Sequence, residues 1–170
     1  MSTNQILASR LAIAFFVCLG TLHAAVAQTP SPDLTIRGTV PNELRLTVAD
    51  LKQLPRTSVT AKDHGGATHT YEGVALQALL AKAGAPQGGD IRGKKMTLFV
   101  LVEAGDGYRA VFSLAELDAD FSGTQVLVAD TADGKPLAEK EGPLRLVVPG
   151  DKRPARWVRM LKTITVATAE

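Results

Sequence analysis

The sequence predicts a mixed α/β (α+β) fold, with a mixed β-sheet core and short helices. Runs of alternating apolar and polar residues, or of β-branched residues, recur along the chain and outnumber the stretches with helical spacing. The helical stretches are short and lie irregularly between predicted hairpins. A doubly wound parallel sheet requires a regular alternation of strands and helices, so the pattern argues against that architecture.

The first 27 residues have the organisation of a secretory signal peptide. Arg10 supplies a positive start, an apolar stretch follows over 11–22, and the small residues at 25–27 form a cleavage site. The apolar stretch is shorter than the about 20 residues that a membrane-spanning helix needs. We therefore predict a signal peptide over 1–27, export to the periplasm, a linker over 28–33 and a single folded domain over 34–168.

Cysteine content and charge exclude several classes of protein. The single cysteine, Cys18, lies within the predicted signal peptide, so the exported chain would have neither a disulfide nor a cysteine metal ligand. Lipidation of Cys18 is the alternative, but further apolar residues follow it, which disfavours a lipoprotein signal. The net charge of +2 lacks the strong basic excess of a nucleic-acid-binding protein.

The first half of the chain contains four predicted strands and two predicted helices. Thr47 is placed to cap a short helix that ends before Pro55. A clearer helix follows over 74–83, where apolar residues recur at helical spacing and Gly84 ends the pattern. Alternation predicts the strands at 34–40, 44–46, 57–61 and 68–71.

The second half consists mainly of predicted strands joined by turns. Ser113 is placed to cap a single helical turn over 114–117, and Asp133-Gly134 is a strong turn dipeptide. The last two strands are separated by a long loop that holds three arginines and the only tryptophan. The predicted strands cover 96–102, 108–112, 125–130, 144–148 and 163–167.

That loop, over 149–159, is the strongest candidate for a binding site. It places Arg153 and Arg156 beside Trp157. Guanidinium groups bind carboxylates and phosphates in bidentate fashion, and an indole can stack on a flat heterocycle. The loop therefore suits a planar anionic ligand. On spacing alone, the opposing interpretation is a solvated charged surface with Trp157 filling the core.

Two histidines lie near the turn between the strands at 57–61 and 68–71. His64 and His69, together with Asp63, could bind a metal or carry protons. Two histidines on a hairpin, with no third ligand at metal-binding spacing, are weak evidence for a metal. The pattern favours turn and edge roles, and we predict no metal site.

A predicted hairpin tip over 103–109 combines two carboxylates, a phenol and a guanidinium. Carboxylates accept paired N–H donors from heterocycles such as a pteridine edge, which makes Asp106 a candidate ligand contact. Asp106-Gly107 is equally a routine hairpin turn. Common catalytic motifs are absent, because the sequence contains no GxSxG, P-loop, GxGxxG or HExxH.

Several segments occur in an order that is typical of one known family. They are Leu34–Gly38, Tyr71–Val74, Gly107–Ser113, Asp133–Leu137, Glu141–Gly150 and Arg156–Val158. In their order and spacing, over nearly all of 34–168, the chain resembles the sulfite-oxidase-type molybdopterin-binding domain family, in its short exported bacterial form. The resemblance implies a sulfite-oxidase-type molybdopterin-binding fold.

The resemblance also implies a pocket for a pterin and its phosphate, with Arg153, Arg156 and Trp157 beside it. Enzymes of the family hold molybdenum through a cysteine thiolate, and the matching stretch 59–64 contains no cysteine. Asp63 or His64 could offer an oxygen or nitrogen donor, which would tune a metal differently. A pterin or molybdopterin-like ligand is therefore expected, and molybdenum is not.

These observations favour recognition over catalysis. We expect an exported pterin-binding protein that acts with a membrane signalling partner. The ligand contacts predicted for it are Arg153 and Arg156 with ligand oxygens, Trp157 with the flat ring, and Asp63, His64 and Asp106 with ring donors. Two alternatives stay open: a molybdenum-cofactor-dependent periplasmic oxidoreductase, and an interaction module whose pocket is vestigial.

Overall fold

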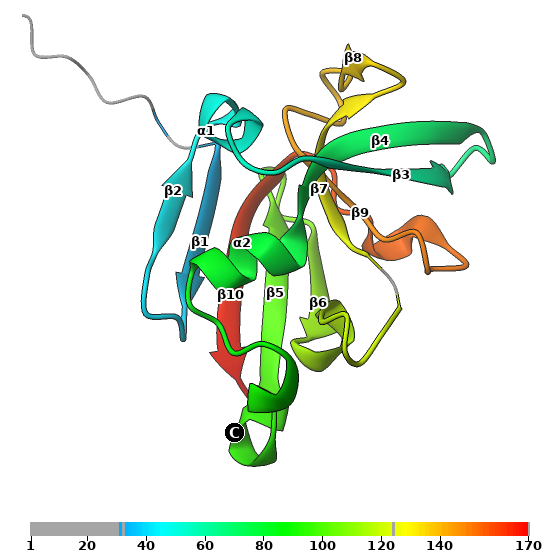
Figure 1. Cartoon of the computed structure of the whole chain (residues 1–170). Coiled ribbons are helices and arrows are strands. Elements are labelled where there is room, and N and C mark those ends of the chain that lie inside the picture. Colours follow the sequence, from blue (N-terminus) through cyan, green and yellow to red (C-terminus); the bar gives the residue numbers. More distant parts are fainter. Residues whose placement is uncertain (1–30, 32, 124, 170) are drawn as a thin grey trace, which may run out of the picture.

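The computed structural model describes residues 31, 33–123 and 125–169. The predicted signal peptide and its cleavage site lie outside the described residues, as does most of the predicted linker. The described chain forms two five-stranded sheets with few helices (Figure 1). This arrangement confirms the predicted α+β fold class.

The first sheet has the strand order β2-β1-β10-β5-β6. It is mixed, because β1 pairs in parallel with β10, whereas all the other pairs are antiparallel. The first and the last strand of the described chain, β1 and β10, are therefore neighbours in the middle of this sheet (Figure 1). Its strands are β1 (Leu34–Gly38), β2 (Leu44–Leu46), β5 (Leu98–Ala104), β6 (Arg109–Ser113) and β10 (Leu161–Thr168).

The second sheet is antiparallel and is built around β7. Strand β4 pairs with β3 on one side and with β7 on the other, while β7 also pairs with β8 and β9. The β3–β4 hairpin projects from this sheet (Figure 1). Its strands are β3 (Thr57–Lys62), β4 (Thr68–Ala75), β7 (Leu127–Ala132), β8 (Lys135–Pro136) and β9 (Arg145–Val147).

The helices are short, as the sequence predicts. Helix α1 (Val48–Lys52) begins after Thr47, whose side chain accepts a hydrogen bond from the Asp50 backbone in a complete capping box. Helix α2 (Leu76–Lys82) buries its apolar face against the first sheet. Four 3-10 segments complete the list: η1 (Gly88–Asp90), η2 (Gly93–Thr97), η3 (Ala115–Leu117) and η4 (Pro154–Arg156).

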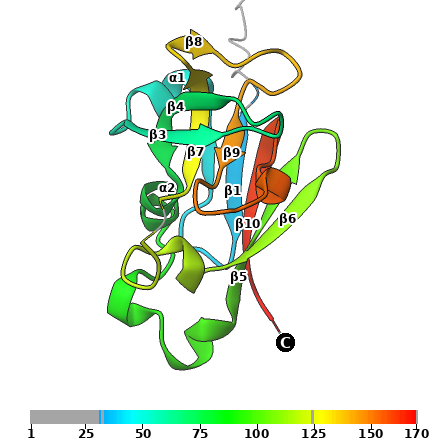
Figure 2. The same cartoon turned by 90° about the vertical axis from the view of Figure 1, so that its right-hand side faces the viewer.

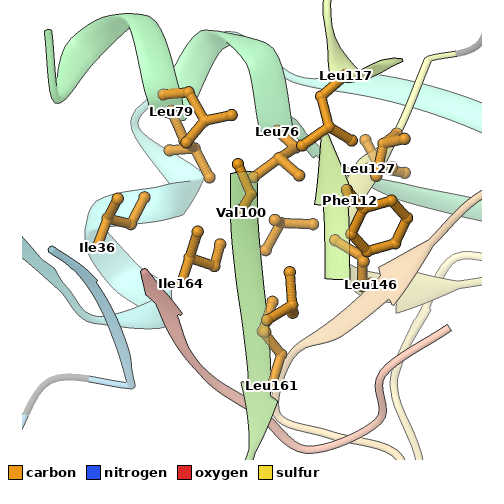
Figure 3. Packing of buried hydrophobic residues seen from close by; sticks show 14 of the residues in the cluster. Ile36, Leu76, Leu79, Val100, Phe112, Leu117, Leu127, Leu146, Leu161 and Ile164 are labelled. Atoms are coloured by element: carbon orange, nitrogen blue, oxygen red, sulfur yellow. The ribbon is translucent and has the colours of Figure 1, made fainter. Parts of the chain in front are cut away.

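Buried apolar side chains from both sheets and from α2 form one cluster. Figure 3 shows Leu76 and Leu79 of α2 above Val100 of β5 and Ile164 of β10. All four side chains are buried, so the helix is held by burial of apolar area. The cluster gives both sheets a fixed relative position, and with them the loops that they carry.

Several predicted boundaries are shifted, and pairing explains the differences at Val74 and Met96. Val74 was expected in the helix but continues β4, because it pairs with Val128 of β7 before the helix starts at Leu76. Met96 was expected in a strand but lies exposed in η2. Its strand begins only at Leu98, where pairing with the end of β10 begins.

One buried ion pair fixes the connection between α1 and β3 to the second sheet. Arg56 donates hydrogen bonds of 2.9 and 2.7 Å to the two carboxylate oxygens of Asp130 on β7. Thr131 donates a third, of 2.6 Å, to the same carboxylate. The Asp130 side chain is only 3% exposed, whereas Arg56 is 30% exposed. A buried carboxylate of this kind depends on its partners for solvation.

Figure 2 shows three loops on one side of the molecule: the β3–β4 hairpin, the loop that carries η4, and the β5–β6 hairpin. Among the described residues, no helix has the length and apolar character to cross a membrane.

Candidate ligand-binding site

A cavity of about 920 Å³ lies between the β3–β4 hairpin and the loop after β9. From the hairpin it is lined by Lys62, Asp63 and His64. From the loop it is lined by residues at 149 and 151–155, and by Trp157. Its volume falls in the range of cavities that hold a cofactor-sized organic molecule. We call it the main pocket.

A smaller cavity of about 310 Å³ adjoins the main pocket, and we call it the annex. The two share His64, Ala155 and Trp157 as lining residues. The annex is also lined by Asp106 and Tyr108 of the β5–β6 hairpin. A ligand longer than one ring system could therefore extend from one cavity into the other.

Three cations face the main pocket without a partner. Among the residues that the structure describes, none bonds to or forms an ion pair with the side chains of Lys62, Lys152 or Arg153. Lys62 is the last residue of β3, whose exposed residues alternate along the strand, and it lies on the same exposed face as Thr60. Both residues line the main pocket. The two loop cations are exposed at the opposite rim.

Both carboxylates of the main pocket are engaged with other protein groups. Asp151 accepts hydrogen bonds from Arg156 at 3.0 and 2.7 Å. Asp63 accepts one from the Ala67 backbone at 2.9 Å, and its other oxygen lies 3.6 Å from His69. The unpaired charges of the main pocket are therefore positive, which favours an anionic ligand.

Trp157 forms a fixed aromatic wall shared by the main pocket and the annex. It is 4% exposed, and its indole N–H donates a 2.9 Å hydrogen bond to the Val148 carbonyl. Its ring meets Tyr71 edge to face at 5.8 Å, and the Arg145 guanidinium lies 5.3 Å from its centroid. Such contacts hold the ring in place, and the small part of it that borders the two cavities is a fixed surface.

Arg145 itself is buried behind this wall, with a side chain that is 2% exposed. Its Nη1 donates to Glu141 at 2.9 Å and lies 3.4 Å from the Tyr71 hydroxyl. Its Nε has no hydrogen-bond partner in the described structure. Buried donors of this kind are rare in folded proteins, and here the orphan donor lies next to the aromatic wall of the pocket.

Arg156 is the one predicted contact that lines neither cavity. Its guanidinium binds Asp151, donates to Glu116 at 3.0 Å, and lies 4.4 Å from the Phe112 ring centroid. The other five predicted residues do surround the cavities: Asp63, His64, Arg153 and Trp157 the main pocket, and Asp106 the annex. Whether these residues contact a ligand stays a prediction.

The annex combines donors and acceptors. Asp106 accepts the Tyr108 backbone N–H at 3.0 Å, which is the turn role that its sequence also allows. The Tyr108 hydroxyl donates to the Ala155 carbonyl at 2.5 Å and so ties the hairpin to the pocket loop. Arg159 completes the lining. The sequence pattern pointed to the phenol of Tyr108 without assigning it a ligand contact, and it gave Lys62 no role because the predicted strand ended at Ala61, whereas β3 continues to Lys62.

His69 links the hairpin to the β7–β8 turn. Its Nδ1 lies 2.6 Å from Asp133, and its ring meets Tyr71 at 5.9 Å. The hydrogen bond to Asp133 raises the pKa of His69, desolvation opposes it, and the charges of Asp133 and Asp63 add to the rise. Across the described residues, no three or more His, Cys, Asp or Glu residues are grouped to hold a metal ion.

We expect the protonated His69 to stabilise the hairpin. Because its pKa is raised in the folded state, this stabilisation is complete below the unfolded-state value and is lost as the pH rises through the folded-state pKa. NMR titration of the ring protons, assigned with His69→Gln, should show the raised pKa. Asp133→Asn should bring it back toward the ordinary histidine value, and an unchanged pKa in this variant would contradict the assignment.

One mixed and one antiparallel sheet with few helices, and a cavity beside the loop after β9, match the class of sulfite-oxidase-type molybdopterin-binding folds. The family model described as "Oxidoreductase molybdopterin binding domain" matches residues 23–170. The chain therefore belongs to this family, as the sequence resemblance predicted. No curated protein sequence is similar enough to count as a match.

A solved structure supports the same conclusion. The chain is similar to the crystal structure of the sulfane dehydrogenase SoxCD from Paracoccus pantotrophus, with a TM-score of 0.62 and 26% sequence identity. The similarity covers 78% of this chain but only 37% of that one, so this chain spans little more than a third of its length.

Proposed function

We propose that this protein is an exported periplasmic domain that binds a pterin or a molybdopterin-like planar anion and does not turn it over. The observation that supports this proposal most strongly is which charged side chains of the main pocket have a protein partner and which do not. Lys62, Lys152 and Arg153 line it without a partner among the described residues, whereas both of its carboxylates are bound by other protein groups. A phosphate or carboxylate on the ligand would supply the missing partner.

The shape of the site supports a flat ligand with an anionic tail. The anionic group would lie among the cations of the main pocket, and the ring would pack beside Trp157 and reach the annex. There Asp106 offers carboxylate oxygens to the ring N–H donors of a pterin, and Tyr108 and Arg159 lie close by. His64 and Asp63 border the ring from the hairpin side.

The residues fit the pterin and its phosphate better than they fit a molybdenum ion. Family enzymes hold that metal through a cysteine thiolate, and the sequence has only Cys18, in the predicted signal peptide. None of the residues that line the main pocket or the annex carries a sulfur atom. We therefore derive no redox step for this chain, and we propose that the bound ligand signals to a membrane protein partner.

Intrinsic fluorescence offers a direct test, because Trp157 is the only tryptophan and it walls the pocket. Titration of the purified protein with oxidised and reduced pterins should quench this emission saturably. Calorimetry provides an independent measurement of affinity. Absence of saturable binding to every pterin tested, by fluorescence and by calorimetry, would refute the proposal.

A molybdenum-cofactor-dependent periplasmic oxidoreductase is the second candidate. It is supported by membership of the oxidoreductase family and by the similarity to SoxCD. Asp63 and His64 are the pocket residues that could offer a metal an oxygen or nitrogen donor. Metal analysis of protein isolated from its native cells separates the two candidates, since stoichiometric molybdenum would favour the oxidoreductase.

A further inference from the structure

We propose that Arg156 sets the preference of the main pocket for anionic ligands without touching the ligand. It does so by neutralising Asp151 and by holding the loop after β9 in place. The inference rests on the proposed function, because it concerns which ligands that site accepts. It assigns to Arg156 a role different from the ligand contact that the sequence predicts.

Asp151 lies between the main pocket and Arg156. This residue lines the main pocket and also a separate cavity of about 220 Å³, and Arg156 lines only the latter. Both carboxylate oxygens of Asp151 accept hydrogen bonds from Arg156. The carboxylate therefore stands between the ligand space and the guanidinium, and its side chain is only 16% exposed.

This arrangement determines whether the negative charge of Asp151 acts on a ligand in the main pocket. With Arg156 in place, the negative charge of Asp151 is cancelled by a bidentate partner on the side away from the ligand. Without Arg156, a bare carboxylate would face the main pocket beside Lys152 and Arg153. It would attract these cations to itself and repel an anionic ligand.

Arg156 also anchors the loop. It reaches Glu116 of η3 and the ring of Phe112 on β6, two elements outside the loop. Glu116 is itself oriented, since it accepts the Ser113 backbone N–H at 3.1 Å and Ser113 Oγ accepts its own N–H. The guanidinium thus has two carboxylate partners and an aromatic partner, which hold it on the far side of Asp151 although its side chain is 37% exposed.

A double-mutant cycle tests the inference with two matched probes. Pterin-6-carboxylate carries a negative charge, and 6-hydroxymethylpterin does not. The measured quantity is the ratio of their dissociation constants, obtained from Trp157 fluorescence. We expect Arg156→Ala to reduce the preference for the anionic probe by about tenfold, because it uncovers one charge near the ligand.

The decisive variant adds Asp151→Asn to Arg156→Ala. If Arg156 acts by masking Asp151, the double variant should recover the preference to within about threefold of the wild type, since the uncovered charge is gone. If Arg156 contacts the ligand directly, the preference stays low in the double variant, and the inference is overturned. Equal weakening of both probes by Arg156→Ala would also overturn it, because that indicates loop positioning alone.

Two further measurements keep the test decisive. Thermal melting checks that each variant is folded. The single variant Asp151→Asn keeps Arg156 and should bind the anionic probe at least as tightly as the wild type. Weaker anion binding by this single variant would contradict charge masking. Binding of neither probe by the wild-type protein would refute the proposed function itself, a result distinct from a failed recovery.

Discussion

Replacement of Asp130 by alanine is expected to lower the free energy of unfolding by about 3 kcal/mol, the lower end of what breaking a buried ion pair costs. The Asp130 carboxylate is buried and accepts two hydrogen bonds from Arg56. Its removal would leave the guanidinium without its partner. The loss is at this lower end because the Arg56 side chain is 30% exposed and water can partly solvate it once Asp130 is gone.

Urea denaturation measures this loss, with Asp130→Asn as the variant that keeps the shape and removes the charge. Burial raises the pKa of Asp130, but the hydrogen bonds from Arg56 and Thr131 and the charge of Arg56 bring it below the ordinary carboxyl value. The charge therefore stabilises the fold above the unfolded-state pKa, and this contribution is lost as the pH falls through the folded-state pKa. The difference between wild type and Asp130→Asn should shrink in acid.

Removal of the two unpaired loop cations is expected to have the largest effect on ligand binding. The double variant Lys152→Ala/Arg153→Ala should weaken binding of pterin-6-carboxylate on the order of 100-fold, since a hydrogen bond to a charged group contributes about 1.5 kcal/mol or more. Neither side chain has a partner in the described structure, so their loss should leave folding stability unchanged. The uncharged 6-hydroxymethylpterin should be affected much less.

A matched control removes the same number of charges far from the pocket. Lys94 and Lys95 are exposed on η2, which is joined to the C-terminal end of β10 by the hydrogen bond from Ala169 to Thr97. Lys94→Ala/Lys95→Ala should change pterin binding little, apart from a small long-range effect that salt screens. If both double variants weaken binding equally, the effect is one of net charge, and the main pocket is not the binding site.

Helix caps and tight turns could be predicted from the sequence because they depend on residues that are neighbours in the chain. The capping of α1 by Thr47 and the turn at Asp133-Gly134 each rest on a few adjacent side chains. Boundaries that depend on a distant partner were less accessible. Val74 looks helical in its own neighbourhood, yet pairing with Val128 keeps it in a strand.

The same division holds for the candidate site. Sequence reasoning found the loop around Trp157 and the hairpin at Asp63 and His64, and the fold brings these segments to one cavity. It could not separate the roles of Arg153 and Arg156, which lie in the same loop and have the same chemistry. One is unpaired at the rim, whereas the other is bound by Asp151 and by Glu116, forty residues earlier in the chain.

The sequence by itself determined the fold family, the positions of most strands and the chemical types available to the pocket. These follow from local side-chain pattern and from the order of motifs. Only the tertiary structure decided which charges meet a partner and which face the cavity. The physical reason is that ion pairing depends on distances of a few ångströms between residues far apart in the chain, and packing alone sets those distances.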